Sequence, residues 1–418
     1  MQLSDWLGRL ERLHFKSIDM GLERIRAVAE RLELVSDTPF VFTVAGTNGK
    51  GSTVALLDAF LRNSGFKTGL YTSPHLVRFN ERVAINGVEC SDHQLISAFE
   101  AVDAGRGDIS LTYFEFTTLA AIWLFKQAKL DAWVLEVGLG GRLDAVNIWD
   151  ADIAVVTSID LDHQAWLGND RITIGREKIG VGRAGRPLVV GEPDFPDELV
   201  QAAQSAGMVL YRQGKEFSLS ENDATWSLSV LVDGQQRELT ELVRPLVYLQ
   251  NAATAIQAVL LSPFRVGEHE IRQALSAVQP QGRRQILQRE PDLMLDVGHN
   301  PHAARALAKH IEQLGYRKVH CIVGMLADKD ITDTLMALLP VVDYWYPTEL
   351  TSDRAAKASY LQEQLLEMGA ICNSTFPSAA PAARRLSKRV DKNDLILVFG
   401  SFYTVADVIQ YAGSITSK

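Results

Sequence analysis

Short apolar runs alternate along this chain with longer stretches whose apolar residues have helical spacing. Residues 40–44 form an apolar run typical of a buried strand, and residues 53–63 then place leucines and a phenylalanine on one helical face. Further strands are predicted at 68–72, 132–137, 153–159 and 187–190. Strands that alternate with helices in this way indicate an α/β fold built on a mostly parallel sheet.

The pattern changes between residues 208 and 242, where polar and apolar residues alternate one by one. This period of two predicts antiparallel hairpins, with a turn at Asp233 and Gly234. After residues 280–284 the β/α alternation starts again, and strands are predicted at 293–297, 319–323, 344–346 and 395–399. We therefore expect two domains: a larger one over residues 1–283 and a smaller, Rossmann-like α/β domain over residues 284–418.

Composition and charge narrow the classes of function. The chain has 418 residues, of which 47% are apolar and 22% charged, as in ordinary folded proteins. Its 42 lysines and arginines against 51 aspartates and glutamates give a net charge of -9, the wrong sign for a protein that coats nucleic acid or anionic lipid. We therefore expect no nucleic-acid partner and no membrane association, and any phosphate must be bound by a local site.

The chain shows no sign of a membrane span or of disulfide chemistry. Its apolar stretches, such as residues 119–125, are far shorter than the roughly 20 residues that cross a bilayer. The first residues do not place a basic segment before an apolar one, so we expect no secretory signal and a cytoplasmic location. Cys90, Cys321 and Cys372 lie far apart without a CxxC pair, which argues against a disulfide framework or a structural zinc site.

A glycine-rich loop, residues 46–52 with the sequence GTNGKGS, lies between the first predicted strand and helix. Glycines let backbone N–H groups converge on phosphate oxygens, the helix N-terminus adds partial positive charge, and Lys50 brings an ammonium group. The P-loop pattern is imperfect, because Val44 stands at its first glycine position and Gly51 follows Lys50 in place of a hydroxyl residue. We expect a phosphate loop; a glycine-rich turn without a ligand is the alternative.

Polar residues follow two further predicted strands, at the edge where α/β sheets bind ligands. Glu136 lies near the end of one strand, and Asp162 and His163 come after another. Both Glu136 and His163 would suit a metal site, although either residue alone would equally serve as a cap or as a hydrogen-bonded structural group. Glu177 and Lys178, taken alone, predict a solvated charge cluster.

The second half of the chain repeats the order of strand, polar loop and helix. Residues 295–302, with the sequence LDVGHNPH, and residues 399–403 show this arrangement. Asp296 and His299 would either bind a ligand or cap the helix that begins near Pro301. The residues themselves leave both possibilities open.

Taken together, several segments in one order resemble the folylpolyglutamate synthase and dihydrofolate synthase family, relatives of the Mur ligases. The match runs nearly from end to end. Its segments are residues 18–24, 46–52, 72–76, 80–82, 136–145, 162–163, 177–178, 251–255, 282–283 and 296–301. Separate matches in the right order are more specific than any one of them.

The resemblance implies an ATP-dependent amide ligase whose larger domain is a Mur-ligase-like P-loop ATPase. Such an enzyme transfers the γ-phosphate of ATP to a carboxylate, and the amino group of L-glutamate attacks the acyl phosphate. We expect a bifunctional enzyme that acts on dihydropteroate and on reduced folates. The alternatives are a monofunctional folylpolyglutamate synthase, a Mur-type peptide ligase, and a nucleotide-binding switch without ligase activity.

The resemblance also implies roles for individual residues. Catalytic roles fall to Lys50, Glu136, His163 and Lys178. The implied ATP contacts are Thr47, Asn48, Gly49, Lys50, Gly51, Ser52, Asn251, Arg283 and Asp296. The implied magnesium ligands are Ser73, Glu136, His163 and Lys178, the lysine being carbamylated by carbon dioxide and therefore anionic.

Substrate contacts are implied in the same way. Folate contacts are Asp19, Met20, Gly21, Thr112, Tyr113, Phe114, Glu115, Leu143, Asp144 and Ala145, although Phe114 and Phe116 would also fit a buried core. Glutamate contacts are His299 and Ser401. The implied cofactors are ATP and Mg²⁺ at two sites, with a monovalent cation such as K⁺ as a further candidate. We expect a monomer whose partners are small-molecule substrates.

Overall fold

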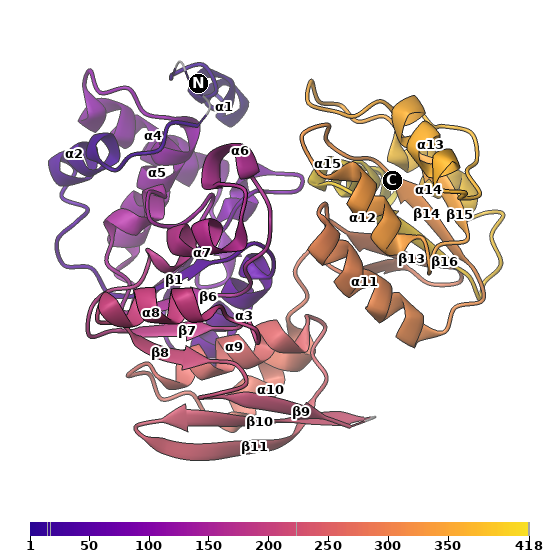
Figure 1. Cartoon of the computed structure of the whole chain (residues 1–418). Helices are drawn as coiled ribbons and strands as arrows, with labels where there is room; N and C mark the ends of the chain where they lie inside the picture. Colours follow the sequence, from indigo (N-terminus) through magenta and orange to yellow (C-terminus); the bar gives the residue numbers. More distant parts are fainter. Residues whose placement is uncertain (15, 17, 223, 417–418) are drawn as a thin grey trace. The chain divides into compact units, whose positions relative to one another are not determined.

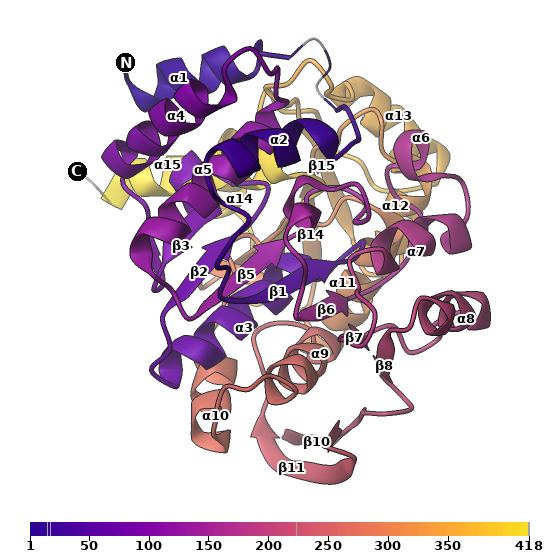
Figure 2. The same ribbon diagram turned by 90° about the vertical axis from the view of Figure 1, so that its left-hand side faces the viewer.

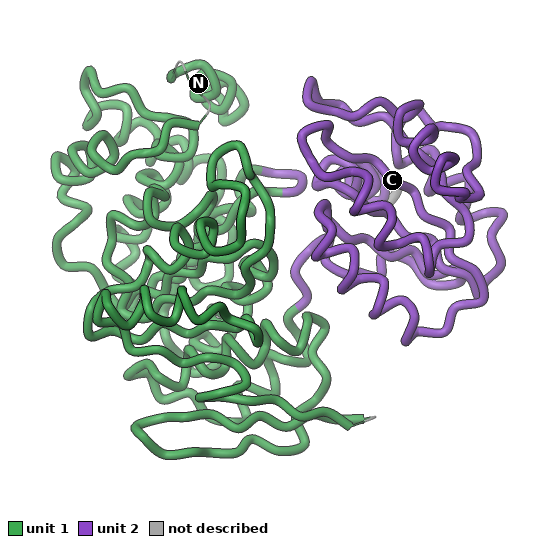
Figure 3. The backbone as a smooth tube through the Cα atoms, in the orientation of Figure 1, with its two compact units in different colours: residues 1–75, 79–278 green, residues 76–78, 279–418 purple. Residues whose placement is uncertain are grey.

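The computed structural model describes residues 1–14, 16, 18–222 and 224–416. It divides the chain into two compact units: unit 1 holds residues 1–75 and 79–278, and unit 2 holds residues 76–78 and 279–418 (Figure 3). The chain therefore leaves unit 1 after residue 278, whereas the expected boundary followed residue 283. The segment 76–78 belongs to unit 2 although it lies early in the sequence.

An eight-stranded sheet forms the centre of unit 1 (Figure 1), and its strand order is β4-β3-β2-β5-β1-β6-β7-β8. From β2 to β8 neighbouring strands are parallel, whereas β3 and β4 extend the β2 edge in antiparallel pairing. The strands are β1 (Phe40–Ala45), β2 (Thr68–Tyr71), β3 (Val83–Ile85), β4 (Val88–Glu89), β5 (Ala132–Glu136), β6 (Ile153–Val156), β7 (Pro187–Val190) and β8 (Val209–Arg212). The predicted α/β fold with a mostly parallel sheet is confirmed.

Helices cover both faces of this sheet (Figure 2). Apolar side chains of α1, α2, α4 and α5 pack on one face, and those of α3, α9 and α10 pack on the other. The helices of unit 1 are α1 (Leu3–Leu10), α2 (Glu23–Arg31), α3 (Lys50–Asn63), α4 (Asp92–Arg106), α5 (Tyr113–Ala128), α6 (Gln164–Leu167), α7 (Arg171–Ile179), α8 (Asp197–Ser205), α9 (Leu249–Leu260) and α10 (Glu268–Ala277), with short 3-10 turns η1 (Phe79–Arg82) and η2 (Ala145–Ile148).

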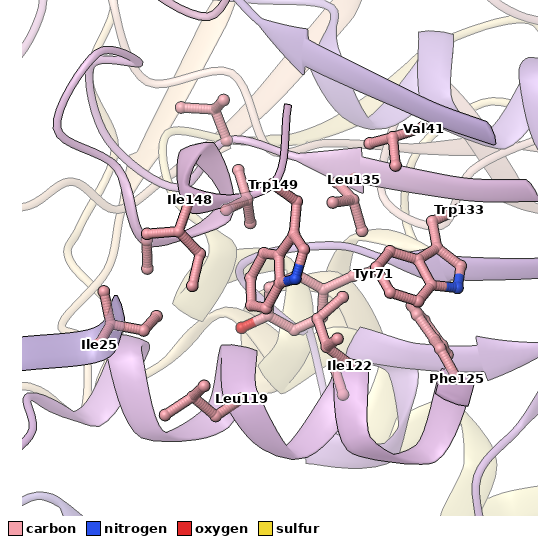
Figure 4. Close-up of a cluster of buried hydrophobic side chains, with 14 of the residues drawn as sticks. Ile25, Val41, Tyr71, Leu119, Ile122, Phe125, Trp133, Leu135, Ile148 and Trp149 are labelled. Atoms are coloured by element: carbon pink, nitrogen blue, oxygen red, sulfur yellow. The ribbon is translucent and has the colours of Figure 1, made fainter. Parts of the chain in front are cut away.

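Large aromatic side chains fill the space between the sheet and α5 (Figure 4). Trp133 of β5 is fully buried, and its ring centroid lies 6.3 Å from those of Phe125 in α5 and of Trp149. The indole N–H of Trp149 donates to the Leu34 carbonyl oxygen at 2.9 Å, so this buried polar group is satisfied. The packing holds α5 along β5, and Phe114 in its first turn meets Gly138, just beyond the end of the strand.

The alternating segment forms the antiparallel sheet that its pattern predicts. Its strands are β9 (Ser218–Glu221), β10 (Thr225–Val232) and β11 (Gln235–Val243). Asp233 and Gly234, with φ of 52° and 73°, make the predicted two-residue turn. The prediction was wrong for β8, which pairs in parallel with β7 and joins the main sheet. This strand is so short that its own pattern does not select a partner, and the neighbouring β7 decides the pairing.

Unit 2 is built on a five-stranded sheet in the order β12-β13-β16-β14-β15. All its pairs are parallel except that of the edge strand β12, which the sequence pattern did not predict. Helices α11, α12 and α13 pack on one face, and α14 and α15 pack on the other, as in Rossmann-like folds. The strands are β12 (Gln285–Gln288), β13 (Asp292–Asp296), β14 (Val319–Val323), β15 (Tyr344–Pro347) and β16 (Leu395–Phe399). The helices are α11 (Pro301–Leu314), α12 (Ile331–Leu338), α13 (Ala358–Glu367), α14 (Ala379–Leu386) and α15 (Phe402–Thr416).

None of the helices in the described residues has the length and apolarity that crossing a bilayer requires.

Candidate active site

The glycine-rich loop connects β1 to α3, where a phosphate loop belongs. Lys50 is the first residue of α3 and is half-buried, rather than lying in an exposed loop. Its Nζ donates to the carbonyl oxygens of Gly46 at 2.9 Å and Thr47 at 3.3 Å. The ammonium group therefore lies over the loop, beside the N-terminus of α3, where both charges favour an anion.

Asn251 of α9 contacts this loop although it lies far away in sequence. Gly49 has a φ of 91°, a conformation that favours glycine, and a Cβ there would overlap the Asn251 side-chain amide. Asn251 therefore lies beside the loop residues that, like Asn251 itself, are expected to contact ATP.

The segment after β6 holds the other side of the loop. The Thr47 N–H donates to the Ser158 carbonyl oxygen at 2.8 Å, and the Asn48 N–H donates to the Ser158 Oγ at 3.0 Å. The Thr157 hydroxyl donates to the Asn48 carbonyl oxygen at 2.6 Å. These two hydroxyls were not among the predicted site residues, although a Thr-Ser pair directly after a strand is a signal that could have indicated them.

Glu136 and Ser73, two expected magnesium ligands, lie together. Glu136 ends β5 and is 3% exposed, and its Oε2 accepts a hydrogen bond from the Ser73 N–H at 3.0 Å. Because β1, β2 and β5 are neighbours in a parallel sheet, their carboxyl ends bring these residues and the phosphate loop to one edge.

Lys178 is buried in the last turn of α7, with only 4% of the residue exposed. Burial lowers the pKa of Lys178 to about 7, the Lys50 charge acts in the same direction, and Asp162 opposes both. The solvated charge cluster that Glu177 and Lys178 alone would predict is therefore wrong for Lys178. These charges place Lys178 in the electrostatic neighbourhood of the phosphate loop and of Asp162.

The turn after β5 fits closely against this end of α7. A Cβ at Gly141 would lie 2.6 Å from the Glu177 carbonyl oxygen, so only glycine permits the approach. The Arg142 N–H donates to the same carbonyl oxygen at 2.8 Å, and the Arg142 guanidinium pairs with the Glu177 carboxylate at 2.8 Å. The Gly-Gly-Arg segment thus fixes the position of Lys178.

His163 occupies a more open position. It has a φ of 52°, its side chain is 39% exposed, and its Nε2 lies 3.9 Å from the nearer Asp162 oxygen. It directly precedes α6, on the segment that begins with Thr157 and Ser158. The strand before this segment ends at Val156, earlier than predicted, which leaves residues 157–163 irregular.

The expected folate residues gather around Arg24. Its NH1 lies 2.7 Å from Asp19 Oδ2, and its NH2 lies 3.2 Å from Glu115 Oε1. Glu115 in turn accepts a hydrogen bond from the Thr112 N–H at 2.8 Å, in the capping box that starts α5. Met20 lies instead against Gly140, since its Cε is 3.7 Å from the position of a Cβ on that glycine.

Two phenylalanines in the first turn of α5 have different environments. Phe116 is completely buried in the core, whereas Phe114 is half-buried. The Phe114 ring lies against Gly138, where a Cβ would come within 2.6 Å of it, and its centroid is 5.9 Å from that of Tyr71. Phe114 therefore borders the strand end that carries Glu136, while Phe116 is a core residue.

Asp144, which lies between Leu143 and Ala145, stabilises the loop after β5 through hydrogen bonds to backbone N–H groups. Its carboxylate accepts hydrogen bonds from the Leu139 N–H at 2.8 Å and the Val146 N–H at 3.1 Å. Burial raises the pKa of Asp144 to about 7, although these amides and the Lys50 charge oppose the shift.

In unit 2, polar residues again follow the carboxyl ends of strands. Asp296 ends β13 and accepts from the Arg284 N–H at 3.0 Å and the Gly298 N–H at 2.8 Å, while burial raises the pKa of its carboxyl group. The N-cap of α11 is Asn300, which accepts from the Ala303 N–H at 2.9 Å. Asp296 and His299 are therefore not the helix cap that the sequence left open.

Ser401 follows β16 and is 3% exposed. Its Oγ accepts a hydrogen bond from the Thr404 N–H at 3.1 Å, which satisfies the start of α15. His299 contacts the Val297 carbonyl oxygen through Nδ1 at 3.0 Å, and Arg283 is half-buried beside the Asp296 charge.

The residues present fit a magnesium site that is completed by a nucleotide. Within the described part of the chain, no three His, Cys, Asp or Glu side chains gather in a metal-binding arrangement. Mg²⁺ commonly takes only one or two protein oxygens and fills its other positions with water and substrate phosphates. The Glu136 carboxylate and Ser73 hydroxyl beside a phosphate loop are such a donor set.

A P-loop sheet unit, followed by a Rossmann-like unit with polar residues at its strand ends, defines the architecture of Mur-type ligases. Residues 282–402 match the family model described as Mur ligase, glutamate ligase domain. The chain is 47% identical over 409 residues to the dihydrofolate synthase/folylpolyglutamate synthase of Escherichia coli strain K12, which covers 98% of this chain and 95% of the relative.

Solved structures agree with this similarity. "E.coli FolC in complex with DHPP and ADP" matches with a TM-score of 0.95 and 46% identity, over 100% of this chain and 99% of that chain. A bifunctional folylpolyglutamate synthase/dihydrofolate synthase with Mn, AMPPNP and L-glutamate bound matches with a TM-score of 0.90 and 48% identity, over 98% of each chain. The chain belongs to the dihydrofolate synthase/folylpolyglutamate synthase family and is an amide-forming ligase.

Proposed function

We propose that this protein uses ATP to ligate L-glutamate to 7,8-dihydropteroate, forming dihydrofolate, and to reduced folates, forming polyglutamates. The observation that carries the proposal is that unit 1 holds three groups: the Lys50 ammonium on the phosphate loop, the Glu136–Ser73 pair at the carboxyl end of the neighbouring strand, and buried Lys178, which lies within electrostatic influence of Lys50. Cations and metal-binding oxygens are what phosphoryl transfer to a negatively charged carboxylate requires.

The proposed reaction has two steps. An oxygen of the acceptor carboxylate attacks the γ-phosphorus, the bond to the β-phosphate oxygen breaks, and ADP leaves with that electron pair. The neutral amino group of glutamate then attacks the acyl carbon, phosphate leaves, and the nitrogen loses a proton to solvent. Lys50 and the N-terminus of α3 orient and neutralise the phosphates throughout. Magnesium, when held by Glu136 and Ser73, would neutralise charge on the phosphate oxygens.

Lys178 acts in this proposal as a carbamate. Its lowered pKa makes the neutral amine available near pH 7, and the amine nitrogen would attack carbon dioxide and release a proton. The product is an anionic oxygen donor, which replaces a second cation beside Lys50. His163, on the adjacent segment, completes the proposed second metal position.

The remaining residue roles follow the same proposal. Asn251, Arg283 and Asp296 would contact the nucleotide, and His299 and Ser401 would contact glutamate. The folate contacts would be Asp19, Met20, Gly21, residues 112–115 and residues 143–145. Two Mg²⁺ positions, a monovalent cation such as K⁺, a monomeric state and a cytoplasmic location belong to the proposal as well.

Glutamate-dependent ADP release, measured separately with dihydropteroate and with tetrahydrofolate, tests the proposed function. We expect release with both acceptors, and a product whose mass has grown by one glutamyl residue. Turnover with tetrahydrofolate alone would leave a monofunctional folylpolyglutamate synthase. ATP hydrolysis without either acceptor would favour a nucleotide-binding switch.

A further inference from the structure

Arg82 is a buried cation that the mechanism above does not use. It ends η1 and is only 9% exposed. Its guanidinium carbon lies 5.5 Å from the ring centroids of both Phe79 and Tyr113. Among the residues that the structure describes, no carboxylate lies within ion-pair distance of Arg82.

A hydrogen bond to the His75 side chain orients the guanidinium. Arg82 Nε donates to His75 Nδ1 at 2.9 Å, so the imidazole presents a lone pair at that nitrogen. This hydrogen bond orients Arg82 but brings no negative charge to its guanidinium group.

Arg82 lies between the metal-binding and the ring-binding parts of the candidate site. Its carbonyl oxygen accepts from the Thr72 N–H at 2.9 Å, and the next residue, Ser73, donates its N–H to Glu136. Its guanidinium faces Tyr113, which directly precedes Phe114 in α5. A ligand that reaches from Phe114 toward the Ser73–Glu136 pair would therefore pass close to Arg82.

We propose that Arg82 binds the acceptor carboxylate that receives the γ-phosphoryl group. The inference rests on the proposed function, in which that carboxylate is the anion common to both acceptors. A buried guanidinium without an anion is costly, and a carboxylate from the substrate would supply its missing partner. The planar guanidinium donates two parallel N–H bonds to a carboxylate, which would fix the plane of the attacking group.

Arg82→Met tests this assignment, because methionine keeps apolar contact with Phe79 and Tyr113 but removes the charge. We expect the KM for dihydropteroate and for tetrahydrofolate to rise about tenfold to hundredfold, the range for a lost charged hydrogen bond, with little change in the KM for ATP or glutamate. Arg82→Lys keeps the charge but cannot donate two parallel N–H bonds, so it should give a smaller rise in the acceptor KM values. Arg244→Met removes an exposed arginine paired with Glu221, and serves as the matched control with wild-type KM values.

Thermal unfolding separates binding from a structural role. We expect the ligand-free Arg82→Met variant to unfold within a few degrees of wild type, and to lose the rise in Tm that dihydropteroate gives wild type. If that variant does not fold, Arg82→Lys with wild-type acceptor KM values would overturn the proposal.

The kinetic outcomes are equally distinct. Unchanged acceptor KM values in Arg82→Met would overturn the assignment. So would a rise confined to tetrahydrofolate, which would assign Arg82 to the glutamate tail, or a rise confined to ATP or glutamate. Failure of wild-type protein to ligate either acceptor would instead remove the proposed function, while the Tm shift with dihydropteroate would still report on Arg82.

Discussion

Burial changes the chemistry of Lys178. Because its pKa falls from 10.5 to about 7, the unfolded chain binds a proton between these pH values that the folded protein does not. By linkage, Lys178 makes the free energy of unfolding rise with pH across this window. In buffer free of carbon dioxide, we expect Lys178→Met to lose this rise, which is at most about 1.4 kcal/mol per pH unit, as measured by denaturant unfolding. An identical slope in wild type and variant would contradict a buried neutral amine.

The same residue allows a test by chemical rescue. Lys178→Ala should lose ligase activity, because it removes the proposed anionic donor beside Lys50. A short carboxylic acid added in solution should restore part of the activity by filling the vacated position. Lys215→Ala, which removes an exposed lysine of unit 1, is the control and should keep full activity. No gain in the activity of Lys178→Ala on adding the acid, or an equal relative gain in Lys215→Ala, would argue against a specific site.

Phe114 and Phe116 form a matched pair for testing the ring pocket. Phe114→Ala should weaken the first glutamate addition by about 1 to 3 kcal/mol of lost aromatic contact, with ATP binding unchanged. Phe116→Ala, which empties a fully buried position, should instead lower stability by about 3 to 5 kcal/mol. Steady-state kinetics and denaturant unfolding of both variants provide the comparison. A stability loss without a kinetic effect in Phe114→Ala would make it a core residue.

At the scale of elements, an ion cluster of Arg171, Glu192 and Asp194 stabilises the segment after β6. Glu192 Oε2 accepts from the Ile159 N–H at 2.8 Å, and Arg171 Nε donates to the Ile159 carbonyl oxygen at 2.9 Å. Asp194 holds Arg171 through two bonds of 3.0 Å. Ile159 directly follows Thr157 and Ser158, whose hydroxyls bind the phosphate loop. The ion cluster therefore helps to position the phosphate loop through this segment.

This ion cluster predicts that its disruption will raise the KM for ATP selectively. Glu192→Leu leaves the buried Ile159 N–H without an acceptor, and we expect the KM for ATP to rise about tenfold while the acceptor KM stays near wild type. Glu192→Gln retains an oxygen for this N–H and should behave like wild type. Equal kinetic effects of the two substitutions would point to lost charge rather than to positioning.

How far the sequence predicts the elements depends on their length and neighbours. The strands at 187–190, 319–323 and 395–399 were predicted with the observed bounds, because continuous apolar runs between polar turns are local signals. The partner of β8 was predicted wrongly and β12 was missed, since a strand of four residues at a sheet edge carries too short a pattern to select its partner. The phosphate loop was located by its flanking strand and helix, whereas the burial of Lys178 depends on packing that no local pattern contains.

At the scale of the whole molecule, the expected site residues are divided between the two units. The phosphate loop, Glu136 and Lys178 belong to unit 1, and Arg283, Asp296, His299 and Ser401 belong to unit 2. The chain crosses between the units after residues 75, 78 and 278. The sequence pattern predicted two domains. It did not predict that residues 76–78 belong to unit 2, because that segment is too short to carry a periodicity. Segment 80–82 was part of the family resemblance, but no role was predicted for Arg82, since a buried charge without a carboxylate partner is visible only once its neighbours are known.

In the proposed mechanism, the acceptor carboxylate takes up the γ-phosphoryl group before glutamate attacks. Dihydropteroate labelled with oxygen-18 in its carboxylate tests this most directly, by mass analysis of the phosphate released during ligation. We expect each phosphate to carry one labelled oxygen, because the carboxylate oxygen that attacked phosphorus leaves with it. Unlabelled phosphate, formed while glutamate is ligated, would rule out this phosphoryl transfer.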